Sequence, residues 1–396
     1  MKKHYVKYIM ALGHFCVDFT QGTLSAVLPF LIASHHYSYA TAASLVMVTN
    51  LVGSVIQPVF GVLADRIDRP HMVTVGALLA GGGMAAVGFI PSFWGLCIAV
   101  IITGIGVAML HPQAARMVNR MADEDNMGMS MGIFSFGGNA GFTIGPVVAA
   151  GAITVLGLKG TLTFLIPALV FALIMVLFYR SYEGEAKMAP REKETAKQPA
   201  DDWWGAFFKL GVLITCRSII FSGFSTFLIL YLIEEFSLSK PAGSALLSLY
   251  FGIGALSSLL GGKLADVSGL KKTLAFSCCI LVAGTLVFAL SDSLALAACM
   301  IVVMGLGSNI GYSAMVTLGQ LYLPNHIGLA SGVTLGLSVS IGGILAPVLG
   351  KLGDVHGLRI VFFILAGLAI LAMLISFVVP SRGKGESAHL SGEENM

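Results

Sequence analysis

The sequence predicts an all-α membrane protein in which twelve transmembrane helices form two pseudo-symmetric six-helix bundles. Three observations support this prediction: the composition, the length of the apolar segments and a repeat between the two halves of the chain. Of the 396 residues, 56% are hydrophobic and 11% are charged, and the mean hydropathy is +0.88. Soluble globular proteins are typically about 25% charged, so we expect this chain to lie in lipid.

The apolar segments are long enough to cross a membrane as helices. A helix needs about 20 apolar residues to span the ~30 Å hydrocarbon layer, whereas a transmembrane barrel would show short alternating segments. Hydropathy and the positions of glycine and proline predict twelve spans. They are residues 8–33, 40–64, 71–90, 93–118, 127–156, 160–180, 205–233, 241–264, 272–290, 293–322, 327–352 and 358–379.

A charged segment divides the chain into two halves. Residues 181–204 are rich in Lys, Glu, Ala and Pro and end in two tryptophans, as expected of a solvated linker that reaches the membrane interface. We therefore predict an N-terminal bundle at 1–180, a cytoplasmic linker at 181–204, a C-terminal bundle at 205–380 and a disordered cytoplasmic tail at 381–396. Most Lys and Arg residues then lie on the side of both termini, which the positive-inside rule places in the cytoplasm.

The two halves carry the same short patterns at one fixed spacing. Gly61-Val-Leu-Ala-Asp65 recurs 201 residues later as Gly262-Lys-Leu-Ala-Asp266, and Pro146 recurs as Pro347. A shared offset in separate segments indicates an internal repeat of six helices. Parallel repeats of this kind are a transporter architecture, with the substrate site near the bilayer midplane.

The first predicted span carries a polar stripe. His14, Asp18, Gln21 and Ser25 fall on one face of a 3.6-residue helix whose other faces are apolar. At 1.5 Å per residue, Asp18 lies about 16 Å into the membrane if the span begins near Lys7. A carboxylate at that depth is costly and normally faces a partner or a water-filled cavity. It is a candidate proton site, with His14 one turn away; the alternative is a structural bond to a neighbouring helix.

Other polar residues within the spans are candidates for substrate binding. Arg217 has three interpretations: it binds an anionic substrate, pairs with Asp18, or reaches back to the inner membrane surface. His111 lies near the inner end of the fourth span, and Arg116, about 140° further around the helix, is either a substrate ligand or an interface anchor. Further candidates are Gln21, Asn139, Asn309 and Tyr312, although the asparagines and the tyrosine would serve equally well in hydrogen bonds between helices.

The repeated loop pattern resembles that of the major facilitator superfamily, and the likeness extends over nearly the whole chain. Gly61, Leu63, Ala64, Asp65, Arg66 and Arg69 match the family motif, while Asp68 and Pro70 depart from it. The second copy keeps Gly262 and Asp266 but lacks two of the basic residues. The resemblance implies a gating role for this motif, by contacts that form in one conformation and break in the other. A charged loop that obeys the positive-inside rule is the simpler alternative.

Two further patterns resemble particular branches of that superfamily. Gly141, Gly145 and Pro146 resemble a motif of drug and proton antiporters, although close helix packing explains small residues equally well. His14, Asp18, Gln21 and Pro29, together with His111-Pro112 and Arg116, resemble the fosmidomycin-resistance branch. The resemblance implies proton-driven export of a small drug-like or anionic compound from a bacterial cytoplasmic membrane. A proton symporter that imports a metabolite is the alternative, and an intramembrane enzyme a distant one.

Several classes of function find no support in the sequence. There is no P-loop for ATP-driven export, and the net charge of +3 gives no reason to expect a nucleic-acid partner. The six cysteines show no metal-ligand spacing, and His14 with Asp18 makes only two potential ligands. We therefore expect no cofactor, no metal and no enzymatic activity. The expected partners are a small-molecule substrate, protons and membrane lipid, and we expect a monomer.

Overall fold

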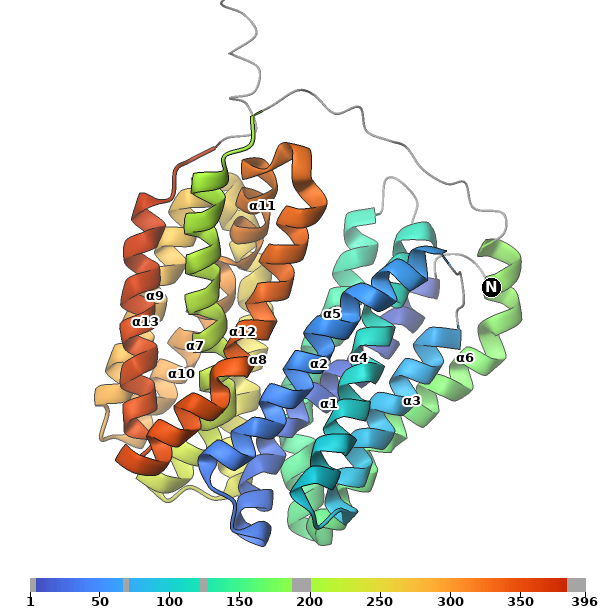
Figure 1. Ribbon diagram of the computed structural model, residues 1–396, viewed down its shortest axis with the longest axis horizontal. Coiled ribbons are helices and arrows are strands. Elements are labelled where there is room, and N and C mark those ends of the chain that lie inside the picture. The colour runs from blue at the N-terminus through green and yellow to red at the C-terminus, as the bar shows by residue number, and fades with distance from the viewer. Residues whose placement is uncertain (1–4, 67–70, 122–126, 187–200, 383–396) are drawn as a thin grey trace, which may run out of the picture. The chain divides into compact units, whose positions relative to one another are not determined.

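The first six helices follow the predicted spans closely. The structure is a computed structural model that describes residues 5–66, 71–121, 127–186 and 201–382, and every regular element in these ranges is a helix (Figure 1). The longer helices of the first half are α1 (Val6–His35), α2 (Tyr39–Arg66), α3 (His71–Ala86), α4 (Phe93–Met121), α5 (Met127–Leu156) and α6 (Leu165–Ala186). Short 3₁₀ helices at Val87–Phe89 and Gly157–Phe164 lie between them.

The second half contains one more helix than the sequence predicts. It consists of α7 (Trp204–Phe236), α8 (Lys240–Ser268), α9 (Leu270–Leu290), α10 (Leu294–Ile310), α11 (Tyr312–Tyr322), α12 (Ile327–His356) and α13 (Arg359–Val378), with a 3₁₀ turn at Pro324–His326. The tenth predicted span, 293–322, is thus broken at Gly311. With α10 and α11 counted as one crossing, the described helices make the twelve spans of the predicted fold.

The surface of the helices fits a membrane. Nine stretches of the described residues are long and apolar enough to cross a bilayer, with α5 and α6 counted together. On α6 the large apolar side chains of Leu173, Val176 and Leu177 are more than half exposed. Apolar surface of this kind is stable only against lipid. The chain is therefore a multi-pass membrane protein.

The helices fall into two compact units, each with its own apolar core. The first unit contains α1 to α6 and also Ser225–Gly252 and Ala346–Leu358 from the second half of the chain. Its core includes Val17, Leu110 and Phe171, which are fully buried. The second unit contains most of the remaining residues of α7 to α13, around Leu274 and Leu318 among others. The bundle boundaries predicted from the sequence stay a prediction.

Within the first unit, the N-terminus of α2 is held by residues from α7 and α12. Asp354 accepts hydrogen bonds from the backbone N–H groups of Tyr39 (2.7 Å) and Ala40 (3.1 Å), so it caps this helix from a distant part of the sequence. The hydroxyl of Tyr39 donates to Glu234 Oε2 over 2.6 Å. Segments more than 190 residues apart in the sequence are thus joined at one helix end.

Candidate functional site

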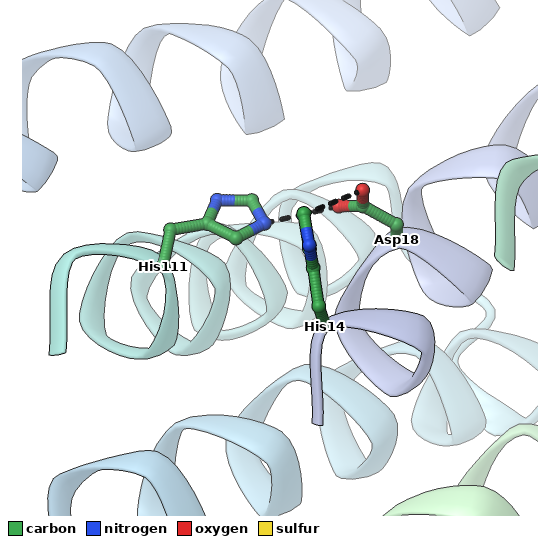
Figure 2. A group of neighbouring side chains, drawn as sticks. All are labelled: His14, Asp18 and His111. Atoms are coloured by element: carbon green, nitrogen blue, oxygen red, sulfur yellow. Dashed lines mark hydrogen bonds and ion pairs between the residues drawn. The ribbon is translucent and has the colours of Figure 1, made fainter. Parts of the chain in front are cut away.

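The polar stripe of α1 forms a three-residue cluster with α4. Two imidazole rings face the carboxylate of Asp18: His14 Nε2 is 3.1 Å from Asp18 Oδ2, and His111 Nε2 is 3.0 Å from Asp18 Oδ1 (Figure 2). The two rings meet edge to face, with centroids 4.9 Å apart. Each carboxylate oxygen therefore lies at hydrogen-bond distance from a different imidazole ring. We call His14, Asp18 and His111 the carboxylate–histidine cluster.

The local sequence explains how these side chains meet. His14 and Asp18 are four residues apart on α1, so they stand one above the other on the same face. His111 comes from α4, directly before Pro112, which lies inside that helix. On the remaining side Gly138 of α5 leaves the space open, because a Cβ there would lie 2.4 Å from Asp18 Oδ2 and 2.5 Å from His14 Nε2.

A third group, the backbone carbonyl of Phe134, fixes the orientation of His14. Its oxygen lies 2.8 Å from His14 Nδ1, and the Phe134 ring stacks on the imidazole with centroids 4.2 Å apart. A carbonyl oxygen can only accept a hydrogen bond, so Nδ1 carries a proton. Both nitrogens of His14 therefore face an oxygen.

These contacts determine how many protons the cluster holds. If Nδ1 carries a proton, the bond between His14 Nε2 and Asp18 needs a second one, either on Nε2 or on the carboxyl group. Without it, a lone pair on Nε2 would face a carboxylate oxygen. His111 needs no extra proton, because a neutral ring donates through Nε2. The pair of His14 and Asp18 thus has a place for one removable proton.

The cluster is mostly buried, but its side chains keep some accessible surface. The side chain of Asp18 is 9% exposed, and those of His14 and His111 are 15% and 20% exposed. Both histidines therefore retain more accessible surface than the carboxylate to which they are hydrogen-bonded.

The donor atoms of the cluster also lie close enough together to meet one cation. One nitrogen from each histidine and one carboxylate oxygen lie within 4.8 Å of one another. In this structure, however, each of these nitrogens faces an oxygen of Asp18 at hydrogen-bond distance. We therefore treat the cluster as a hydrogen-bonded group. The expectation of no metal stays a prediction.

The other candidates in the first unit lie outside this cluster. Gln21 and Asn139 are half-buried on α1 and α5, and the backbone carbonyl of Asn139 accepts a hydrogen bond from the Thr143 hydroxyl. Arg116 is half-buried on α4, one turn beyond His111. Their proposed roles in substrate binding stay predictions.

The glycines of the candidate antiporter motif lie against the backbone of α1. A Cβ on Gly141 would be 2.5 Å from the carbonyl oxygen of Phe15, and one on Gly145 would be 2.7 Å from that of Phe19. Pro146 follows inside α5. These residues allow α1 and α5 to approach closely, which is the packing role considered from the sequence. Their connection with antiport stays a prediction.

In the second unit, Arg217 binds the protein's own backbone. The side chain is 6% exposed on α7 and donates to Ser277 Oγ (2.8 Å) and to the carbonyl oxygens of Gly307 (3.0 Å) and Ser308 (2.8 Å). Nearby, the Asn309 amide lies against Gly254 of α8, and Tyr312 is 36% exposed at the start of α11. The three interpretations of Arg217 made from the sequence did not include hydrogen bonds to backbone carbonyls.

Part of the candidate gating motif lies outside the described residues. This applies to Arg69 and to the side chains of Asp65 and Arg66, whereas Gly61 belongs to the described backbone of α2. The second copy is described: Asp266 is exposed near the end of α8, and a Cβ on Gly262 would meet nothing within 4 Å. The gating role stays a prediction.

Sequence reasoning missed two residues that shape the cluster, Phe134 and Gly138. The role of Phe134 depends on its carbonyl group, which every residue has, so the sequence held no signal for it. Gly138 belongs to the pair Gly137-Gly138, one turn before Gly141, and this extension of the glycine pattern towards the cluster was a usable signal. The sequence also did not pair His111 with Asp18.

Comparison with known proteins agrees with the fold. The family model of the Major Facilitator Superfamily matches residues 10–347. The chain is 27% identical over 379 residues to the fosmidomycin resistance protein of Escherichia coli, covering 95% of this chain and 93% of that protein. It is 30% identical over 389 residues to the uncharacterized MFS-type transporter YfnC of Bacillus subtilis, covering 96% and 94%.

A solved structure has the same architecture at low sequence identity. A bacterial homologue of the human lysosomal transporter Spinster, crystallised in an inward-facing and unoccupied conformation, superposes with a TM-score of 0.79 at 16% identity. The match covers 96% of this chain and 97% of that one. The family model covers well over half of the chain, and the relatives cover nearly all of it. The chain therefore belongs to the Major Facilitator Superfamily of membrane transporters.

Proposed function

We propose that this protein is a proton-coupled antiporter that exports a small drug-like or anionic compound. In this proposal it works as a monomer in a bacterial cytoplasmic membrane, with both termini in the cytoplasm, and it alternates between conformations that open to either side. The observation that carries the proposal is the position of Asp18, held between two histidines within a membrane-spanning helix.

The hydrogen bonds of the cluster support a role in proton transfer. The pair of His14 and Asp18 is fully bonded only when it holds one extra proton, and its side chains are partly accessible. Loss of that proton turns an attractive contact into a repulsive one. The energy of a proton gradient can therefore be converted into a change of structure at this pair.

The place of the cluster between two helices supports coupling to movement. His111 belongs to α4, whereas His14 and Asp18 belong to α1, so the bond between His111 and Asp18 joins the two helices. When the protonation of Asp18 changes, the strength of this link changes as well, because bonds to a charged carboxylate are stronger than bonds to a neutral one. A shift of α4 against α1 would follow.

The direction of transport rests on the relatives and on the packing of α1 with α5. The Escherichia coli relative is named for fosmidomycin resistance, and a Bacillus subtilis relative that is 24% identical over 330 residues is named a nitrite extrusion protein. The first name states resistance to a compound, and the second states extrusion of an anion. Gly141 and Gly145, which match the antiporter motif, pack directly on the helix that carries Asp18.

Transport in proteoliposomes with an imposed pH gradient tests the proposal. Fosmidomycin serves as the substrate, and a pH-sensitive dye in the lumen reports protons. We expect wild-type protein to move fosmidomycin against the proton flux and Asp18→Asn to lose at least ~90% of gradient-driven transport, because the amide cannot release a proton. Asp201→Asn is the matched control, since this carboxylate is exposed outside the membrane spans.

The possible outcomes separate the alternatives. Full gradient-driven transport by Asp18→Asn would contradict a proton role for this residue. Movement of fosmidomycin in the same direction as protons would show a symporter instead. If the wild type moves neither fosmidomycin nor protons, while a known antiporter does so in parallel, the proposed substrate class is wrong.

A further inference from the structure

We propose that Arg217 is a positioning residue that holds the break between α10 and α11 and so sets the place of Tyr312. It does this by binding the protein's own carbonyl groups and has no direct contact with substrate. The inference rests on the proposed transport function only for its second readout. All residues that carry it belong to the second unit.

The backbone at the break explains what Arg217 binds. In an α-helix the carbonyl of each residue accepts from the N–H group four positions later, so Gly307 would pair with Gly311. Here the N–H of Gly311 instead donates to the carbonyl of Asn309. The carbonyl of Gly307 has therefore lost its helical donor, and it accepts from Ser277 Oγ (3.0 Å) and from Arg217 Nη2 (3.0 Å).

The environment makes this replacement necessary. Within a membrane, a break in a helix occurs only where it is buried in protein or lines a water-filled cavity. Gly307 and Arg217 are both buried, so the protein itself must supply a new partner for the freed carbonyl. The guanidinium supplies one for Gly307, and the same Nη2 also donates to the carbonyl oxygen of Ser308 over 2.8 Å. Its other terminal nitrogen, Nη1, donates to Ser277 Oγ over 2.8 Å and lies 3.6 Å from Cys278 Sγ.

The site fits a guanidinium group and leaves little space for a larger side chain at Gly311. Arginine presents several N–H groups in a rigid planar fork, whereas lysine has a single ammonium group. Gly311 packs directly on the same hydroxyl, because a Cβ on it would lie 2.6 Å from Ser277 Oγ. Arg217, Ser277 and Gly311 thus pack closely together, and the guanidinium group of Arg217 joins α7 to the end of α10.

The consequence is the position of Tyr312, the first residue of α11. At the 201-residue offset of the repeat, Tyr312 corresponds to His111. In the first unit α4 continues through Pro112 at this level, and His111 is held by Asp18. In the second unit the helix breaks, and Tyr312 remains 36% exposed. Each half therefore joins its first helix to its fourth span here. The first half does so through groups that can lose a proton, and the second half through an arginine, which stays charged.

Hydrogen–deuterium exchange in nanodiscs tests the proposal without requiring transport. We expect amide exchange in the peptide covering residues 307–315 to rise at least tenfold in Arg217→Met and less in Ser277→Ala. The α4 peptide 104–114 is the internal control and should not change. Arg359→Gln is the matched arginine variant, since Arg359 makes a partly exposed ion pair with Asp292. If Arg217→Met does not fold, Ser277→Ala and Arg217→Lys decide the test.

Arg217→Lys separates positioning from substrate binding. It keeps the positive charge but loses the planar fork. We expect raised exchange at 307–315 and a fall in the maximal rate of fosmidomycin transport with little change in KM. Unchanged exchange with a raised KM would overturn the proposal and make Arg217 a substrate ligand. Unchanged exchange with normal transport would overturn it too. Because exchange is measured without substrate, a failed transport proposal leaves this test intact.

Discussion

At the scale of single residues, the cluster depends on which oxygen each imidazole faces. His14 has an oxygen at both ring nitrogens, while His111 binds Asp18 through Nε2. The two histidines are therefore not equivalent. In the proposed mechanism, His14 and Asp18 share the removable proton, and the bond from His111 makes α4 sensitive to the charge of Asp18. Substitutions at the two positions should have different effects on the dependence of transport on pH.

The first prediction concerns His111→Ala. This change removes the link between α1 and α4 but leaves the pair of His14 and Asp18 in place. A hydrogen bond to a charged group is worth about 1.5–3 kcal/mol, so we expect transport to fall roughly 10- to 100-fold. The remaining activity should keep a dependence on pH. In His14→Ala, by contrast, that dependence should itself change.

Transport rates between pH 5.5 and 8.5 check this prediction. His326→Ala is the control, because that ring is half-exposed and bonded to Asp202 in the second unit. Equal pH profiles for the two cluster variants would contradict the division of roles.

A second prediction concerns Asp202, which lies just before α7. Partial desolvation acts to raise the pKa of this carboxyl, but hydrogen bonds from the Asn325 backbone and the His326 ring outweigh it, and the pKa lies below its ordinary value. Such a group stabilises the folded state above its ordinary pKa of about 3.9, and the contribution is lost as the pH falls through the lowered value.

The fluorescence of Trp204 can be used to follow the contact between Asp202 and His326, because the Trp204 ring lies 5.5 Å from the His326 ring. We expect wild-type emission to change only below about pH 4. Asp202→Asn should show the changed emission already at neutral pH, whereas Asp201→Asn should behave as wild type. A transition at the same pH in all three proteins would show that Asp202 is not responsible.

At the scale of helices, close packing of α1 on α5 holds the cluster together. A Cβ on Gly141 would lie 2.5 Å from the Phe15 carbonyl oxygen and 2.6 Å from the Phe19 nitrogen, both of them backbone atoms. Backbone cannot move aside as a side chain can. We expect Gly141→Ala to push the helices apart and to destabilise the protein by about 1–3 kcal/mol.

Gly151→Ala is the matched control for this prediction. It lies on the same helix, but a Cβ there would meet nothing within 4 Å. Thermal unfolding in detergent should show a clear loss for Gly141→Ala and little change for Gly151→Ala. Equal melting temperatures would mean that α1 and α5 can separate slightly at no cost.

At the scale of the whole molecule, distant parts of the chain meet within one unit. Asp354 of α12 caps α2 through two backbone N–H groups, and Glu234 of α7 binds the Tyr39 hydroxyl. These contacts lie within the first compact unit, and the bundle boundaries predicted from the sequence stay a prediction. Segments of the second half take part in the packing of the first.

The fourth prediction is that Asp354→Ala lowers stability. Loss of an N-cap costs about 0.5–2 kcal/mol, which corresponds to a fall in the melting temperature of roughly 2–5 °C. Asp292→Ala is the control, because Asp292 is 81% exposed and its pair with Arg359 is expected to contribute little. A larger fall for Asp292→Ala than for Asp354→Ala would contradict the capping role.

The sequence by itself determined the fold class and most of the helix positions. Lipid provides no hydrogen bonds, so each long apolar segment must form a helix, and its limits can be read from hydropathy. The predicted first span, 8–33, became Val6–His35, and the eighth, 241–264, became Lys240–Ser268. Asp18 was also identified from the sequence, since a carboxylate at mid-membrane is unusual in any fold.

Only the tertiary structure decided the partners of these residues. Helical periodicity tells which side chains share a face of one helix, but not which helix lies opposite. The contact of Asp18 with His111 joins positions 93 residues apart, and the place of His14 depends on a backbone carbonyl that no sequence pattern marks. The same holds for Arg217: its partners became available only because the helix breaks at Gly311, and a backbone carbonyl freed in this way has no signature in the sequence.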